Sequence, residues 1–121
     1  MKPHQNLEAW KKSFSFVKAV YLITEKFPVD ERFGLTSQIR RSSVSIPSNI
    51  AEGAGRKSKK EFIQFLSISL GSLSELDTQL LLSKELGFIN ESDCDKLVLE
   101  LDIIGKLIYG LMKSLGYLSE R

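Results

Sequence analysis

Residues 34–57 read GLTSQIRRSSVSIPSNIAEGAGRK, and this stretch decides how the rest of the chain is interpreted. Its apolar residues recur three or four positions apart, which predicts a helix from about Thr36 to Ala54. Pro47 lies in the middle of that helix, where it lacks a backbone N–H and crowds the carbonyl group of Ser43. We therefore expect this helix, the second of the chain, to be kinked at Pro47 rather than broken there.

Three further helices are predicted around this stretch. The first runs from about Leu7 to Phe27, before Pro28, because a residue that precedes proline disfavours the helical region. The third begins with a capping box, Ser58 to Glu61, and ends at Leu86-Gly87-Phe88 with glycine in the left-handed position. The fourth starts near Asn90 and stops at Leu115-Gly116. Four amphipathic helices with short connections predict an all-α, up-down-up-down four-helix bundle formed by one domain, residues 1–121.

The apolar surface of the first helix is wider than one bundle needs. One line is Leu7, Trp10, Phe14, Val17 and Tyr21, and a second line beside it includes Phe16, Val20, Ile23 and Phe27. The interior glycine Gly71 costs about 1 kcal/mol relative to alanine, which a close approach by another helix would explain. With Gly105 and Gly110, these features predict a homo-oligomer.

Charge is segregated along the chain. Residues 32–60 hold seven cations against Glu52 alone, whereas residues 75–102 hold eight anions against Lys84 and Lys96. The third helix, about 28 residues long, separates its two end turns by roughly 40 Å. This is several Debye lengths at physiological salt, where one is about 8 Å, so the basic and acidic turns do not neutralise each other.

The basic turn is the first candidate site. Four cations, Arg56, Lys57, Lys59 and Lys60, surround the start of the third helix, where the helix dipole is already positive. Cations beside free backbone N–H groups suit phosphate binding. Arg40 and Arg41 are candidate phosphate contacts nearer the other end of the bundle. The alternative interpretation is a solvated run of charges.

Asn49, Glu52 and Arg56 share one face of the second helix. Glu52 could act as a general base, but ordering of the helix through a pair with Arg56 or Arg41 is the favoured interpretation. No histidine and carboxylate pattern of a di-iron bundle occurs, since His4 is the single histidine. We therefore expect no metal, no cofactor and no catalytic activity.

Composition points to the cytoplasm. No apolar run is long enough to span a membrane, and no leader-like segment follows Lys2. A lone cysteine, Cys94, forms no internal disulfide, which fits a reducing compartment.

Three segments closely resemble one protein family: GLTSQIRR (34–41), SIPSNIAEG (45–53) and GSLSEL (71–76). They are similar to the bacterial four-helix bundle family, also called the 23S rRNA-intervening sequence proteins. The start at Leu7 to Lys11 and the turn at Gly87 to Ile89 extend the resemblance over nearly the whole chain. A related group, the accessory proteins of diversity-generating retroelements, forms pentamers of such bundles that bind nucleic acid and a reverse transcriptase. The resemblance therefore implies a pentamer with RNA or DNA contacts, in which Pro47, Asn49, Glu52 and Gly71 belong to the structural motif.

Together these features predict a non-catalytic, oligomeric accessory protein that binds RNA or DNA through backbone phosphates. A protein–protein interaction scaffold without nucleic-acid binding is the alternative.

Overall fold

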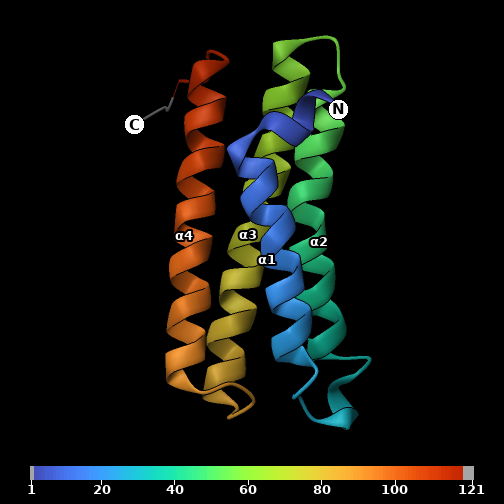
Figure 1. The fold of residues 1–121 in the computed structure, drawn as a ribbon, viewed down its shortest axis with the longest axis vertical. Coiled ribbons are helices and arrows are strands. Elements are labelled where there is room, and N and C mark those ends of the chain that lie inside the picture. Colours follow the sequence, from blue (N-terminus) through green and yellow to red (C-terminus); the bar gives the residue numbers. More distant parts are fainter. Residues whose placement is uncertain (1, 119–121) are drawn as a thin grey trace.

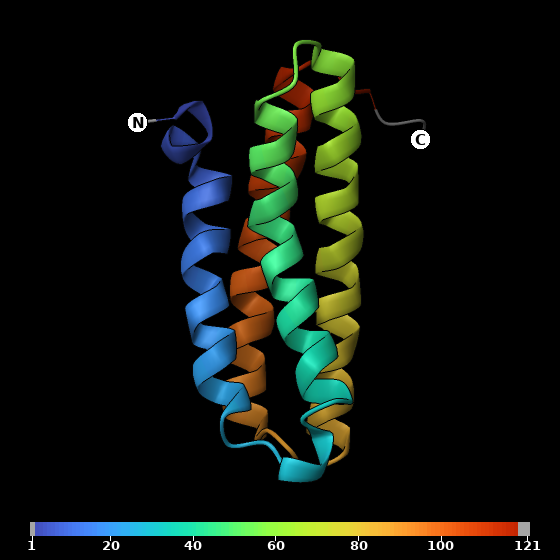
Figure 2. The same cartoon turned by 90° about the vertical axis from the view of Figure 1, so that its right-hand side faces the viewer.

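The computed structural model describes residues 2–118 and shows four long helices side by side (Figures 1 and 2). They are α1 (Glu8–Thr24), α2 (Leu35–Ala54), α3 (Lys59–Glu85) and α4 (Glu91–Ser114). Two short 3-10 helices, η1 (Pro3–Asn6) and η2 (Val29–Glu31), precede α1 and α2. Neighbouring helices run in opposite directions, which confirms the predicted up-down-up-down bundle.

The helix ends follow the local sequence signals. The Ser58 hydroxyl accepts a hydrogen bond from the Glu61 N–H at 3.1 Å, and Asn90 Oδ1 accepts one from the Asp93 N–H at 2.8 Å. At the end of α3, Gly87 has φ +79°, and the Phe88 N–H donates to the Ser83 carbonyl at 2.9 Å. Gly116, with φ +102°, ends α4 with the same pattern. Both predicted glycine caps are confirmed.

The first helix ends three residues before the predicted Phe27. Its last α-helical residue is Thr24, and the chain then tightens, with the Phe27 N–H donating to the Thr24 carbonyl at 3.1 Å. The Thr24 side chain is buried, and its hydroxyl donates to the Val20 carbonyl at 2.7 Å. Pro28 lacks the N–H that would bond to the Thr24 carbonyl in a continued helix, and the Phe27 N–H bonds to that carbonyl instead.

The proline does not interrupt α2, which is helical on both sides of the buried Pro47. The kink itself stays a prediction. α2 packs tightly against α3 at Gly53, where an added Cβ would be 2.8 Å from the Cβ of Phe65. Gly71, in contrast, is exposed, and nothing in the described chain lies within 4 Å of an added Cβ. The expected close approach at Gly71 is therefore not made within this chain.

One hydrophobic core extends along the bundle, and each helix contributes one line of side chains to it. In α1 the buried line is the second of the two predicted lines, with Phe16 and Val20 fully enclosed. The first line is only partly covered: Leu7 and Trp10 pack against the core, whereas Phe14 is 58% exposed and Tyr21 is 40% exposed. This leaves apolar surface on the outside of α1 and α2.

Candidate nucleic-acid interface

The basic turn connects α2 to α3 at one end of the bundle (Figure 1). Arg56 is held in place there by its neighbours. Its guanidinium donates to Glu52 Oε2 at 3.1 Å, lies 4.0 Å from Glu61 Oε2, and covers the Phe65 ring at 4.8 Å. Arg56 therefore orders the turn, and much of its charge is balanced locally.

The three lysines of the turn differ from Arg56. Lys57, Lys59 and Lys60 are exposed, and no carboxylate of the described residues lies within 4.0 Å of their ammonium groups. The Ser58 cap satisfies the Glu61 N–H, while the N–H groups of Lys59 and Lys60 have no hydrogen-bond partner in the described chain. Three unpaired cations thus lie beside open donors at the positive end of a 27-residue helix.

The antiparallel topology adds cations that the sequence interpretation missed. The last turn of α4, with Lys113, ends at the same end of the bundle, as does the start of the chain with Lys2 (Figure 1). Both lysines are exposed. The position of Lys113 could have been predicted from the order of the helices. In an up-down bundle the fourth helix ends beside the turn between the second and third helices.

The six predicted phosphate contacts do not form one surface. Arg40 and Arg41 lie in the first third of α2, toward the opposite end of the bundle from the basic turn. Arg40 is half-buried: its Nε donates to the Thr24 hydroxyl at 2.9 Å, and its guanidinium covers the Tyr21 ring at 4.5 Å. Arg40 therefore joins the end of α1 to α2, while Arg41 is exposed.

Asn49 and Glu52 make local contacts within α2. The Asn49 amide donates to the Ser45 carbonyl at 2.9 Å, and Glu52 pairs with Arg56 rather than with Arg41. Glu52 is exposed and has no nucleophile beside it, so its contacts match the ordering role and give no support to a general base.

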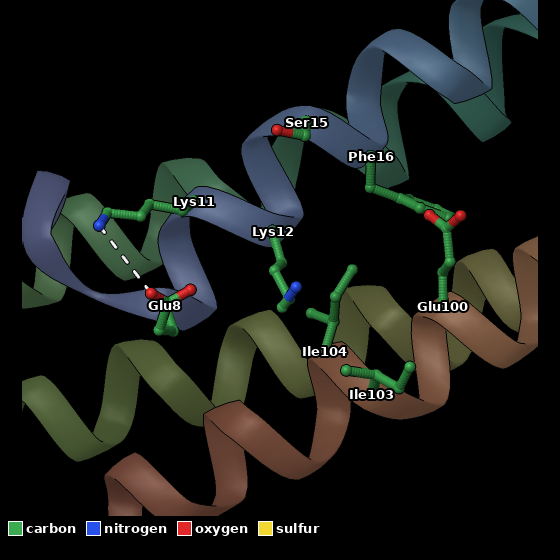
Figure 3. A pocket seen from close by; sticks show the side chains of 8 residues that line it. All are labelled: Glu8, Lys11, Lys12, Ser15, Phe16, Glu100, Ile103 and Ile104. Carbon is green, nitrogen blue, oxygen red and sulfur yellow. Dashed lines mark ion pairs between the residues drawn. The ribbon is translucent and has the colours of Figure 1, made fainter.

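A groove of about 510 Å³ lies between α1 and α4, which pack less closely than the other neighbouring helices (Figure 3). Its rim holds Glu8 and Lys11, 3.9 Å apart, together with Lys12 and Glu100 from facing helices. Phe16 and Ile104 form part of its wall. Charges of both signs on an open rim give neither a nucleophile–base pair nor a one-sided anion site.

Within residues 2–118 no group of three or more His, Cys, Asp or Glu side chains is placed to hold a metal ion. None of the described helices is both long and apolar enough to cross a membrane. Cys94 is fully buried, its thiol donates to the Leu80 carbonyl at 3.6 Å, and burial raises the pKa of the thiol.

The sequence model of the 23S rRNA-intervening sequence proteins matches residues 5–110. The chain belongs to this family. A crystal structure of a protein of unknown function from the S23 ribosomal protein family of Bacteroides thetaiotaomicron VPI-5482 has a similar fold, with a TM-score of 0.79 and 28% sequence identity. The match covers 87% of this chain and 98% of that chain. No curated protein matches the sequence.

Membership in the 23S rRNA-intervening sequence protein family confirms the resemblance carried by residues 34–41, 45–53 and 71–76. The relation to accessory proteins of diversity-generating retroelements stays a prediction, as do the pentamer and the cytoplasmic location. The matched range ends at residue 110, so it includes the basic turn and the arginines of α2 but not Lys113.

Proposed function

We propose that this chain is a non-catalytic, oligomeric bundle that binds RNA or DNA as an accessory factor, through contacts from the basic turn to backbone phosphates. The observation that supports this most is the state of Lys57, Lys59 and Lys60: exposed, without a carboxylate partner in the described chain, and beside open N–H groups. Lysines at a helix start cost stability of about 0.3–1 kcal/mol each, and Glu61 is the single acidic residue in the first turn of α3 that offsets them. A bound polyanion would compensate.

The names of the family and of the similar structure's family both refer to the ribosome or its RNA. RNA is therefore the polyanion to test first. Because lysine contacts to phosphate are not base-specific, we expect little dependence on sequence.

The test is a filter-binding titration of RNA over a range of salt concentrations. If about four phosphates are neutralised, affinity should fall roughly 50- to 150-fold between about 50 and 200 mM salt. Replacing Lys57, Lys59 and Lys60 by Glu should remove most of the binding and lower the salt slope by about 2 to 3.

A matched control keeps the same change in net charge. Lys18, Lys26 and Lys96 are exposed and lie away from the basic turn, so their replacement by Glu should weaken binding far less. Equal losses in the two triple variants would show that only net charge matters, and binding unchanged in both would reject the site.

A protein–protein scaffold is the second candidate, and a different surface favours it. A groove of about 670 Å³ between α1 and α2 is almost entirely apolar, with Trp10, Phe14, Val17, Tyr21 and Pro47 among its lining residues. The scaffold alternative predicts that a partner protein stays bound to this chain after nuclease treatment. The nucleic-acid proposal predicts that RNA co-purifies with the chain and that nuclease treatment releases whatever the RNA holds.

A further inference from the structure

A second pocket with a concentration of cations lies where the α1–α2 connection meets the start of α2. Its volume is about 460 Å³, and its lining includes Arg32, Phe33, Thr36, Ser37, Arg40 and Arg41. This pocket is separated from the basic turn by most of the 20-residue helix α2, a distance of about 25–30 Å. It is therefore a separate site from the one proposed above.

The arginines of this pocket are available to an anion in two ways. Arg40 is fixed against α1 by its bond to the Thr24 hydroxyl, and this bond leaves guanidinium N–H groups without a partner in the described chain. Arg32 and Arg41 are exposed, and no carboxylate of the described residues lies within 4.0 Å of either. A fixed guanidinium flanked by two exposed, unpaired ones suits a phosphate group.

The start of α2 adds backbone donors. Gly34 occupies the cap position without a side-chain cap, and Glu31 Oε1 accepts from the Leu35 N–H at 3.1 Å. The N–H groups of Thr36 and Ser37 have no partner in the described chain. Glu31 thus occupies one donor of this helix end and leaves two beside the pocket.

Thr36 provides a second, independent observation at this pocket. Its side chain lines the pocket and is 7% exposed, and its hydroxyl is the one buried side-chain polar atom of the described residues without a hydrogen-bond partner. An unpaired buried hydroxyl is costly, and a rotation about χ1 exchanges it with the methyl group. A ligand acceptor in the pocket would give the hydroxyl a partner after that rotation.

Phe33 completes the pocket with an aromatic surface. It is 91% exposed, although it stands directly before the buried start of α2. Exposed aromatic rings beside arginines stack on the bases of single-stranded nucleic acid, and each stacked base is worth about 1–3 kcal/mol. Neither a free phosphate nor a phosphorylated side chain would use this ring.

We infer that this pocket binds one unpaired nucleotide of a single-stranded nucleic acid, with the phosphate at Arg32, Arg41 and the open N–H groups of α2. The base stacks on Phe33, and the Thr36 hydroxyl bonds to the sugar or the base edge. The inference rests on the proposed function for its class of ligand, and it adds a single-strand contact at the opposite end of the bundle from the basic turn.

The test is a titration of the full chain with a trinucleotide, followed by NMR of the backbone amides. Binding at the pocket should shift the amide signals of Thr36 and Ser37, while binding at the basic turn should shift those of Lys59 and Lys60. Shifts confined to Lys59 and Lys60 would overturn this inference and leave the proposed function standing. Shifts confined to Thr36 and Ser37 would support this inference and reject the basic turn as the phosphate-contact site. Inorganic phosphate alone should shift the same two α2 amides only weakly, because it cannot stack.

Two variants separate binding from folding. Phe33→Ala should leave the unfolding midpoint unchanged and weaken trinucleotide binding about 5- to 150-fold, in line with the loss of one stacked base. The control Val29→Ala removes another exposed apolar residue of the same connection, 76% exposed and outside the pocket lining, and should leave binding unchanged. If Phe33→Ala instead dissociates an oligomer in sedimentation, Phe33 is an interface residue and the inference is wrong.

Thr36→Val keeps the shape of the side chain and removes the unpaired hydroxyl. It should maintain or raise the unfolding midpoint and weaken trinucleotide binding about threefold to tenfold, the usual effect of one lost hydrogen bond. A purely structural hydroxyl would change stability and leave binding untouched, which would remove Thr36 from the site.

Discussion

Gly53 lies in tight contact with α3, and its missing side chain is a packing requirement. An added Cβ would be 2.8 Å from the Cβ of Phe65 and 2.9 Å from Cδ1 of Phe62. Real Cβ atoms do not approach other atoms so closely, so the two helices would have to separate.

We expect Gly53→Ala to lower the free energy of unfolding by about 1–3 kcal/mol, because overpacking outweighs the gain in helix propensity. Gly71→Ala is the matched control, since an added Cβ there meets nothing within 4 Å in the described chain. It should raise stability by up to about 1 kcal/mol. Urea unfolding of both variants measures the difference, and equal effects would contradict the tight contact at Gly53.

Cys94 makes stability depend on alkaline pH. The thiol is fully buried, and burial raises its pKa above the ordinary value of 9.0. Below that value the thiol is protonated in both the folded and the unfolded state, so it contributes no pH dependence. Above it the unfolded state releases the proton first, and stability falls.

We therefore expect the native protein to lose stability between about pH 8 and 10 more steeply than Cys94→Ala. Comparing the two proteins by urea unfolding isolates the thiol from lysine and tyrosine titrations, which both share. Parallel pH curves would mean that the thiol ionises as easily in the folded protein as in the unfolded one.

At the scale of elements, α2 and α3 form the closest helix pair, and polar side chains join them. The Ser42 hydroxyl lies 2.6 Å from Glu75 Oε1 and 3.0 Å from the Gln79 side-chain oxygen, and Ser45 and Ser72 hydroxyls are 2.7 Å apart. Ser69 donates to the Ile46 carbonyl at 3.0 Å. These bonds require one register between the two helices, which apolar side chains alone specify less strictly.

Ser42→Ala should lower the free energy of unfolding by about 1–3 kcal/mol, because it leaves the buried Gln79 amide without this partner. Adding Gln79→Leu should recover part of that loss, since removing both partners is close to neutral. A double-mutant cycle measures the coupling, and strictly additive effects would show that the two side chains do not depend on each other.

At the scale of the whole molecule, the first apolar line of α1 leaves aromatic side chains that the bundle itself does not cover. Phe14 is 58% exposed and stacks on Trp10 at 4.6 Å between ring centroids, on the rim of the apolar groove between α1 and α2. We propose that a second copy of the chain covers this groove.

Sedimentation should then show an oligomer at micromolar concentration, and Phe14→Glu should dissociate it without unfolding the bundle. The control Leu22→Glu changes another exposed residue of α1, 55% exposed and outside this groove, and should leave the assembly intact. A monomer of the unmodified chain would reject the oligomer proposal.

Local patterns were enough to place four helices, their capping residues and the family motif. Caps, glycine turns and apolar periodicity act within one or two helical turns, so they can be read without knowing the packing. The basic turn could also be predicted from the sequence alone, because all its cations are close together in the chain.

Only the tertiary structure showed which side chains are buried and which residues lie together, because both depend on how the other helices pack. Two apolar lines on α1 are alike in sequence, and only the position of α2 and α4 shows that Phe16 is enclosed while Phe14 is not. Likewise Gly53 and Gly71 are indistinguishable as residues, yet only Gly53 has another helix against it. The pocket at Thr36 draws on residues from α1, the α1–α2 connection and α2, and no sequence spacing reveals that their side chains share one surface.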